Sequence, residues 1–231
     1  MKLFKISMIA GLALALAACG GDDKKSSAKP GTVNEATAKS TATTTVQTAT
    51  TLTTSTDANQ GMTAANQFMG VAQAQSSIIT PDFSGGTTAG TCSCEGTSCT
   101  FQDCGDENGS FTMSGSLDWT GGHIVGDLEY NINSAGSGVS AVYNITLSID
   151  LTVTETSVDG TLSTHGSYSI DLMGQGGADT SGAYSWSSSV DYMNVMYSGA
   201  GGSPTGGSLH VEAMYTIAGI DYAGEADVSF P

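Results

Sequence analysis

Apolar and polar residues alternate along most of the chain beyond residue 109. Alternation with a period of two over this length predicts β-strands that bury one face. The region 182–198 does not keep one parity, which a β-bulge would explain. The apolar set is Phe111, Met113, Leu117, Trp119, Ile124, Leu128, Tyr130, Ile132, Ala141, Tyr143, Ile145, Leu147, Ile149, Leu151, Val153, Leu162, Tyr168, Ile170, Leu172, Leu209, Val211, Ala213, Tyr215, Ile217, Ile220, Tyr222, Ala226, Val228 and Phe230.

The carboxylates of these strands test the assignment. If one face of the sheet is buried, charged side chains should occupy the other parity. Eight of them do so, each within its own strand: Asp118, Asp127, Glu129, Asp150, Asp171, Glu212, Glu225 and Asp227. We therefore expect the second face of the sheet to be polar and exposed.

Turn signals divide the alternating region into about seven or eight strands. We expect hairpins at 119–123, 154–159 and 217–220, and glycine-rich loops at 134–138, 173–182 and 199–207. Strands joined in this way form an antiparallel meander. The sequence thus predicts an all-β domain over residues 109–231, built as a strongly curved sheet, a barrel or a sandwich.

A short amphipathic helix is expected before this domain. Residues 62–79 place Met62, Phe68 and Met69 near one helical face, among Gln, Asn and Ser. Asp57 stands where a residue that caps the helix start is expected. We expect the helix to lean on the sheet that follows.

The segment between the N-terminal apolar run and this helix has a different composition. Residues 19–56 are rich in Ser, Thr, Ala and Lys and nearly devoid of aromatic residues. Such a segment buries too little apolar surface to offset its chain entropy. We interpret it as a flexible tether, with a helix or a β-rich spine as the alternative.

Four cysteines follow within residues 57–108, in a loop after the predicted helix. Cys92, Cys94, Cys99 and Cys104 have the spacing C-x-C-x4-C-x4-C. In an oxidising compartment they are expected to form two disulfides. A bond between Cys92 and Cys94 would close too tight a ring. This leaves 92–99 with 94–104, or 92–104 with 94–99.

The N-terminus has the features of a secretory signal. Lys2 and Lys5 precede an apolar run over residues 6–18, which ends in small residues. The run is shorter than the roughly 20 residues that span a bilayer. Its last part, Leu16-Ala17-Ala18-Cys19, resembles the lipobox of bacterial lipoproteins.

The resemblance covers residues 1–21 and implies a lipid anchor. In that family the signal, here residues 1–18, is cut before the cysteine, and both the sulfur and the new amino group of that residue, here Cys19, are acylated. Two or three acyl chains give stable membrane attachment. Gly20 stands where an Asp would favour the inner membrane, so the resemblance implies the outer membrane.

Charge is distributed unevenly along the chain. All six lysines lie in the first 39 positions, and no Lys or Arg occurs from Ser40 to Pro231, a stretch with a formal charge of −19. Nucleic acid is therefore excluded as an expected partner, because phosphate binding needs Lys or Arg. Within this stretch only protonated histidine can pair with a carboxylate.

Two places offer candidate metal ligands, although no cofactor is implied by a recognisable motif. Oxygen ligands cluster just after the cysteines, at Asp103, Asp106, Glu107 and Asn108, where Ca²⁺ is the expected ion. Their spacing does not match an EF-hand loop, and a polar turn is the alternative.

Histidines suggest a second metal site. His123, Asp127 and Glu129 share the polar parity of one strand, and His210 and Glu212 share that of another. If these two strands were neighbours, a His/carboxylate metal site would form.

Enzyme signatures are absent from the sequence, which has no G-x-S-x-G elbow and no phosphate-binding loop. We expect a non-enzymatic lipoprotein of the bacterial cell envelope with a structural or binding role and an envelope protein or a glycan as partner. The alternatives are a periplasmic carrier or chaperone for an apolar ligand, a carboxylate-dependent hydrolase, and a Ca²⁺-dependent adhesin.

Overall fold

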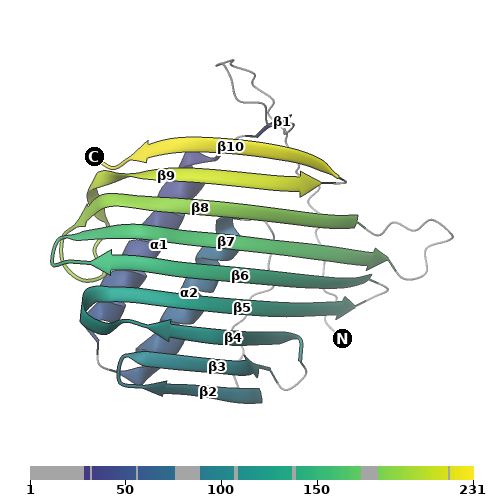
Figure 1. The fold of residues 1–231 in the computed structure, drawn as a ribbon, viewed down its shortest axis with the longest axis horizontal. Helices are drawn as coiled ribbons and strands as arrows, with labels where there is room; N and C mark the ends of the chain where they lie inside the picture. Colours follow the sequence, from purple (N-terminus) through teal and green to yellow (C-terminus); the bar gives the residue numbers. More distant parts are fainter. Residues whose placement is uncertain are drawn as a thin grey trace, which may run out of the picture.

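The structure is a computed structural model that describes residues 29–31, 33–55, 57–75, 89–106, 109–136, 139–172, 182–217 and 219–231. Its main element is one ten-stranded sheet (Figure 1). The predicted signal peptide and Cys19 lie outside the described residues. The strands are β1 (Lys29–Pro30), β2 (Ala89–Glu95), β3 (Ser98–Gly105), β4 (Phe111–Asp118), β5 (His123–Gly136), β6 (Val139–Val153), β7 (Ser157–Leu172), β8 (Gly182–Tyr197), β9 (Pro204–Ile217) and β10 (Ile220–Ser229).

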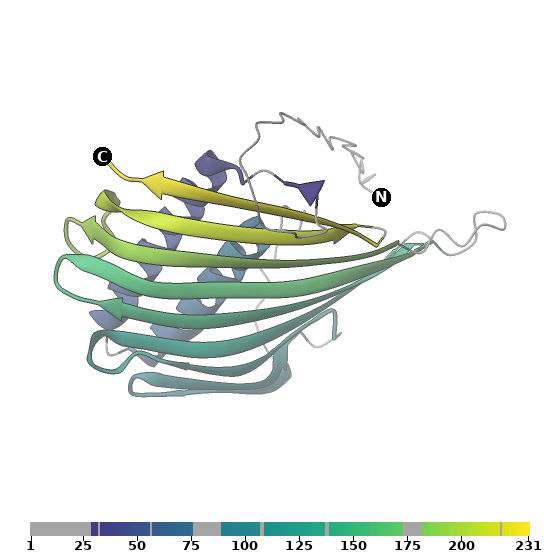
Figure 2. The same ribbon diagram turned by 45° about the horizontal axis from the view of Figure 1, so that its top comes forward.

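Each strand from β2 to β10 pairs antiparallel with its neighbours in the chain, and β1 joins the edge of the sheet parallel to β10. The sheet is curved and stays open (Figure 2). The predicted antiparallel all-β meander is therefore confirmed in its curved-sheet form. The barrel and sandwich forms are wrong, because the sheet does not close and helices cover one of its faces.

The turns between the strands agree with the sequence pattern. The 3-10 turn at Thr120–Gly122 joins β4 to β5, and two further hairpins join β6 to β7 and β9 to β10 at the expected places. The strand count exceeds seven or eight because the segments before residue 109 contribute β1, β2 and β3. The predicted loops at 134–138 and 173–182 lie partly outside the described residues.

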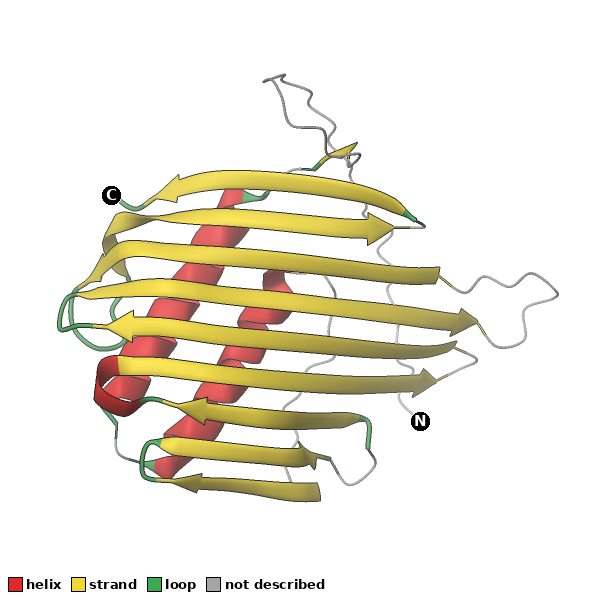
Figure 3. Cartoon of the chain, viewed as in Figure 1, coloured by secondary structure: helices red, strands yellow, loops and turns green. Residues whose placement is uncertain are grey.

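Two helices, α1 (Glu35–Thr53) and α2 (Ala58–Gln75), lie side by side across one face of the sheet (Figure 3). The prediction of a short amphipathic helix is confirmed by α2, where the Asp57 carboxylate accepts the Asn59 amide at 2.9 Å. Residues 76–79 of the predicted range lie outside the described residues. Neither described helix is long and apolar enough to cross a membrane.

The prediction of a flexible tether over residues 19–56 is wrong for residues 35–53, which form α1. Small side chains explain the helix: Ala42, Val46 and Ala49 lie on one side of α1 and are fully buried. The Asn34 side chain caps its start by accepting the amides of Ala36 and Thr37. Packing of this narrow apolar stripe outweighs the low helix propensity of threonine.

Three of the four buried threonines of α1, Thr41, Thr48 and Thr50, satisfy their hydroxyls with hydrogen bonds, whereas the buried hydroxyl of Thr45 has no partner among the described residues. The Thr50 hydroxyl, for example, donates to the Val46 carbonyl at 2.8 Å. The Thr48 hydroxyl donates to the Gln67 side chain of α2 at 3.0 Å, which ties the two helices together. Because most of its buried hydroxyls bond within the helix layer, α1 can present a Thr-rich surface to the interior.

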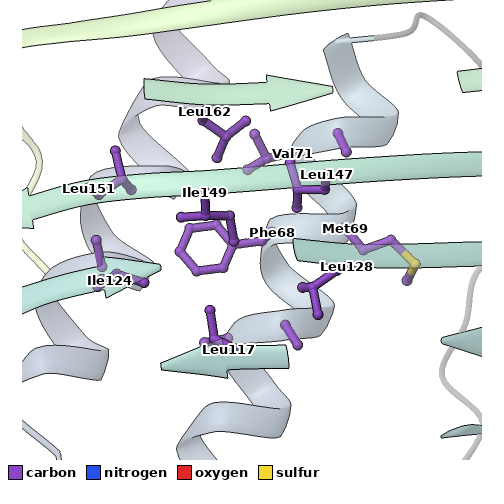
Figure 4. Packing of buried hydrophobic residues seen from close by; sticks show 14 of the residues in the cluster. Phe68, Met69, Val71, Leu117, Ile124, Leu128, Leu147, Ile149, Leu151 and Leu162 are labelled. Carbon is purple, nitrogen blue, oxygen red and sulfur yellow. The ribbon is translucent and has the colours of Figure 1, made fainter. Parts of the chain in front are cut away.

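The core lies between the helices and the sheet. Figure 4 shows Phe68 of α2 among Leu117, Leu128 and Ile149 of the strands, and all four side chains are at most 2% exposed. The Tyr130 hydroxyl donates to the Ala65 carbonyl of α2 at 3.0 Å, and burial raises the pKa of this tyrosine. Apolar contact thus holds α2, and a buried hydrogen bond fixes its position.

One glycine in the middle of a strand is explained by close packing. A Cβ atom at Gly166 of β7 would lie 2.2 Å from the indole ring of Trp186 on β8. Trp186 is 2% exposed, and its indole ring lies against the backbone of β7 at this place. Because Gly166 has no side chain, the indole ring of Trp186 can occupy this space.

The cysteine-rich segment is a hairpin, not the loop that the sequence predicts. β2 and β3 pair antiparallel and extend the sheet at its far edge. The two predicted disulfides are confirmed, with the pairing Cys92–Cys104 and Cys94–Cys99. Both bonds link β2 to β3, so they fasten the strand at this edge of the sheet to its neighbour.

The irregularity predicted in 182–198 is a bulge in β8. Trp186, Val190 and Tyr192 are buried, and the buried parity then changes to Val195. The register with β9 shifts between Met193 and Met196, and Asn194 adopts a positive φ of 48°. The extra residue explains why this strand fails to keep one parity.

Candidate binding face

The side of the sheet without helices, which we call the open face, is mostly polar, with Val125, Met193 and Met214 as exposed apolar side chains among its carboxylates and hydroxyls. Figure 1 views this face with the helices behind it. It carries the side chains of alternate residues, opposite in parity to the buried set. Its carboxylates are Glu95, Asp118, Asp127, Glu129, Asp150, Asp159, Asp191, Glu212, Asp221, Glu225 and Asp227. The predicted polar face is confirmed for the described side chains.

Register arranges part of these carboxylates in a regular row. Along one line across the sheet, the paired residues from β4 to β10 are Asp118, Val125, Asp150, Thr161, Asp191, His210 and Asp227. An aspartate therefore stands on every second strand. Since neighbouring strands lie about 4.8 Å apart, successive aspartates of the row are spaced by about 10 Å.

Hydroxyl groups on neighbouring strands hold several of these carboxylates in place. Ser148 donates to Asp127, Thr161 donates to Asp191, and Thr216 donates to Asp221, each at 2.7 Å. Each carboxylate keeps further acceptor positions that point outward. The face thus presents fixed oxygen acceptors to solvent.

Histidine supplies the ion pairs of the described residues, as the sequence predicts. His123 lies 2.8 Å from Asp150, and His210 lies 2.8 Å from Asp227 and 3.4 Å from Glu212. The hydrogen bond to Asp227, followed by that to Glu212, raises the pKa of His210. The sequence contains the signal for this contact, because residues 210 and 227 are equidistant from the predicted 217–220 turn.

A hollow of about 300 Å³ lies on the same face near one end of the strands. Asn144, Ser167, Ser185 and Thr216 line it and stand in one row on four adjacent strands. Their amide and hydroxyl groups can both donate and accept hydrogen bonds. The open face therefore combines an uncharged hollow, whose lining also includes Tyr168 and Tyr184, with carboxylates on the same strands.

The predicted calcium ligands after the cysteines have local hydrogen-bond partners. The Ser114 hydroxyl donates to Asp103 at 3.3 Å. Asp106 accepts from the Ser110 hydroxyl and from the Phe111 amide, and these bonds lower the pKa of its carboxyl. The other two predicted ligands, Glu107 and Asn108, lie outside the described residues.

The predicted His/carboxylate site between two strands is wrong in its pairing. His123, Asp127 and Glu129 belong to β5, whereas His210 and Glu212 belong to β9, and three strands separate β5 from β9. Among the described residues, His210, Glu212 and Glu225 do have ligand atoms within 4.8 Å of one another. The sequence analysis missed Glu225, which pairs directly with Glu212 across β9 and β10.

The His210 contacts give a testable pH dependence. Asp227→Asn should lower the pKa of His210, and Glu212→Gln should lower it by less, because the bond to Asp227 contributes most. The folded-state pKa lies above the ordinary 6.5. The stability that this contact adds is therefore complete below about pH 6.5 and is lost as the pH rises through the raised value. NMR titration of the imidazole C–H signals measures the shift.

Glu129→Gln is the matched control, because Glu129 is exposed on β5 of the same face and three strands separate β5 from β9. This variant should leave the titration of His210 nearly unchanged. A wild-type His210 that titrates at or below 6.5 would contradict the hydrogen-bonded arrangement.

No family model matches the chain. No curated protein and no solved structure matches it either.

Proposed function

We propose that this chain is a lipid-anchored lipoprotein of the bacterial outer membrane whose open face binds a basic segment of an envelope protein. The anchor follows from the resemblance of Leu16-Ala17-Ala18-Cys19 to a lipobox. The binding role rests on one observation: the open face carries carboxylates on every strand from β4 to β10 and no Lys or Arg.

Charge explains why the partner should be cationic. Carboxylates about 10 Å apart repel one another at salt concentrations up to about 0.1 M, because the Debye length there is also about 10 Å and the repulsion is only partly screened. A partner with Lys or Arg side chains relieves this repulsion and finds acceptor oxygens already positioned. Such electrostatic complementarity raises the rate of association and selects against acidic partners.

The carrier alternative receives less support from the geometry. A carrier needs an apolar cavity of about 300–1,000 Å³ for a small-molecule ligand. The cavity between α1 and strands β8 and β9 has a volume of about 120 Å³. On the helix-bearing side, α1 and α2 fill the space in which a ligand of a curved sheet would lie.

The binding role is tested with a lysine-rich peptide and isothermal titration calorimetry at low ionic strength. We expect the double variant Asp150→Asn/Asp191→Asn to bind the peptide at least fivefold more weakly than the wild type. The control is Glu35→Gln/Glu155→Gln, which removes the same charge from exposed positions outside the open face. Equal weakening by both double variants would show attraction by net charge alone and would overturn the assignment of the face.

The anchor is tested separately by mass spectrometry of the protein isolated from a bacterial membrane. The expected N-terminus is a triacylated or diacylated Cys19 without residues 1–18. An uncleaved and unmodified N-terminus would overturn the proposed attachment.

A further inference from the structure

Two isoleucines are exposed side by side at the hairpin end between β9 and β10. Ile217 and Ile220 are cross-strand partners there, and each is 40% exposed. Tyr215 and Tyr222 form the next pair on the same side of the hairpin, and both are partly buried. On the opposite side, the Thr216 hydroxyl donates to the Asp221 carboxylate at 2.7 Å. From the turn inward, one side of this tip therefore carries a pair of isoleucines and then a pair of tyrosines, and the other side begins with the hydrogen-bonded Thr216–Asp221 pair.

The order of these side chains fits the interface of a bilayer. Isoleucine favours the hydrocarbon, whereas tyrosine is enriched at the headgroup level, where its ring is buried and its hydroxyl stays wet. We call Ile217, Ile220, Tyr215 and Tyr222 the apolar tip.

The chain that leads from the proposed lipid anchor reaches the sheet beside this tip. Strand β1 pairs with β10 at Lys29–Tyr222 and Pro30–Ala223. Lys29 follows Cys19 by ten residues. Ten residues span at most about 35 Å when fully extended and far less as a coil. An anchor at Cys19 would therefore hold this end of the sheet close to the membrane.

Charge favours the same orientation. The lysines of the leading segment, Lys24, Lys25 and Lys29, are attracted to anionic headgroups. The carboxylates of the open face are repelled from the same surface. Attraction is thus concentrated at the edge where β1 meets β10, next to the apolar tip.

We propose that the apolar tip docks into the lipid interface of the membrane that holds the anchor. This inference rests on the proposed lipid attachment and adds an orientation to it. The β9–β10 tip lies in the headgroup region, and the opposite end of the sheet, with the β6–β7 turn, points away. Docking also leaves the open face accessible to a partner.

Tryptophan quenching by brominated lipids tests the orientation. The acylated protein is reconstituted into phosphatidylethanolamine–phosphatidylglycerol vesicles with brominated acyl chains, as the variants Ile220→Trp and Thr156→Trp. Thr156 is exposed in the β6–β7 turn, at the other end of the strands. The native Trp119 and Trp186 are 2% exposed, and the wild type measures their background.

We expect the tryptophan of I220W to be quenched at least threefold more than that of T156W, with a blue-shifted emission. Adding Ile217→Ser to I220W should at least halve this quenching, because the substitution removes the apolar partner of position 220. Far-UV circular dichroism verifies that each variant is folded.

The two proposals fail in different ways. Mass spectrometry of the same preparation reports the acylation of Cys19. Acylated protein in which I220W is quenched no more than T156W would overturn the docking alone. Protein without acyl chains would overturn the anchor, and the docking with it.

Discussion

Replacing Val46 by Asp should unfold the domain or destabilise it by more than about 3 kcal/mol. Val46 is fully buried on α1, between the helix and the sheet. A carboxylate at this place would have no cation within reach, because α1 holds Lys39 as its only basic residue. A buried charge without a partner costs several kcal/mol or forces the structure to open. Urea denaturation followed by circular dichroism measures the loss.

Thr44→Asp is the matched control, because it places the same side chain on the same helix at an exposed position. We expect it to change stability by less than about 0.5 kcal/mol. If Val46→Asp were as harmless as Thr44→Asp, residues 35–53 would be a tether, as their composition alone indicates, and not part of the core.

Replacing Phe68 by Ala should destabilise the domain by about 3–5 kcal/mol, the usual cost of removing a phenyl ring from a core. Phe68 is fully buried and connects α2 to the middle strands of the sheet. The surrounding side chains are held by a continuous ladder of strand pairs and have little freedom to collapse into the space. Thermal unfolding should show a lower Tm with the same far-UV spectrum.

Asn66→Ala on the exposed side of α2 serves as the comparison, and its effect should stay within about 0.5 kcal/mol. A loss below 1 kcal/mol for Phe68→Ala would mean that α2 is not seated on the sheet as described.

The strands could be predicted from the sequence because burial on one face imposes a period of two. The bulge of β8 was also visible in the sequence as a break in the alternation, because the buried parity changes between Tyr192 and Val195. Glycine and polar residues marked the positions of the hairpins. Because hairpins join strands that are neighbours in the chain, the hairpin positions also predicted the order of the strands in the sheet. The hairpin β2–β3 was missed because the cysteines at 92, 94, 99 and 104 carry its buried parity and resemble a stapled loop.

Helix α1 was expected only as an alternative to a flexible tether, because its composition argues against a helix. Threonine disfavours helices, and alanine says little about burial. The stripe of Ala42, Val46 and Ala49 becomes meaningful only when a curved sheet is present to receive it. Tertiary packing, which lies outside local sequence, decides this element.

Some features of the open face could be predicted from the sequence. Its charge followed from the parity of the carboxylates, and a hairpin centred on 217–220 fixes the pairing of His210 with Asp227. The alternating row across β4 to β10 was not accessible, because it depends on the register of six successive strand pairs. A slip of one residue at any of them would place the next aspartate on the other face.

The path of α1 has a consequence for how the chain acquires its structure. The helix contacts β5 and β6 as well as β9 and β10, so the earliest long element to be synthesised rests partly on the last. Each hairpin can form with its immediate predecessor as the chain lengthens, which favours rapid local assembly. The groove for α1, however, is completed only when the final two strands arrive. A chain truncated before β9 would therefore leave part of the apolar stripe of α1 uncovered, and such exposed apolar surface favours aggregation.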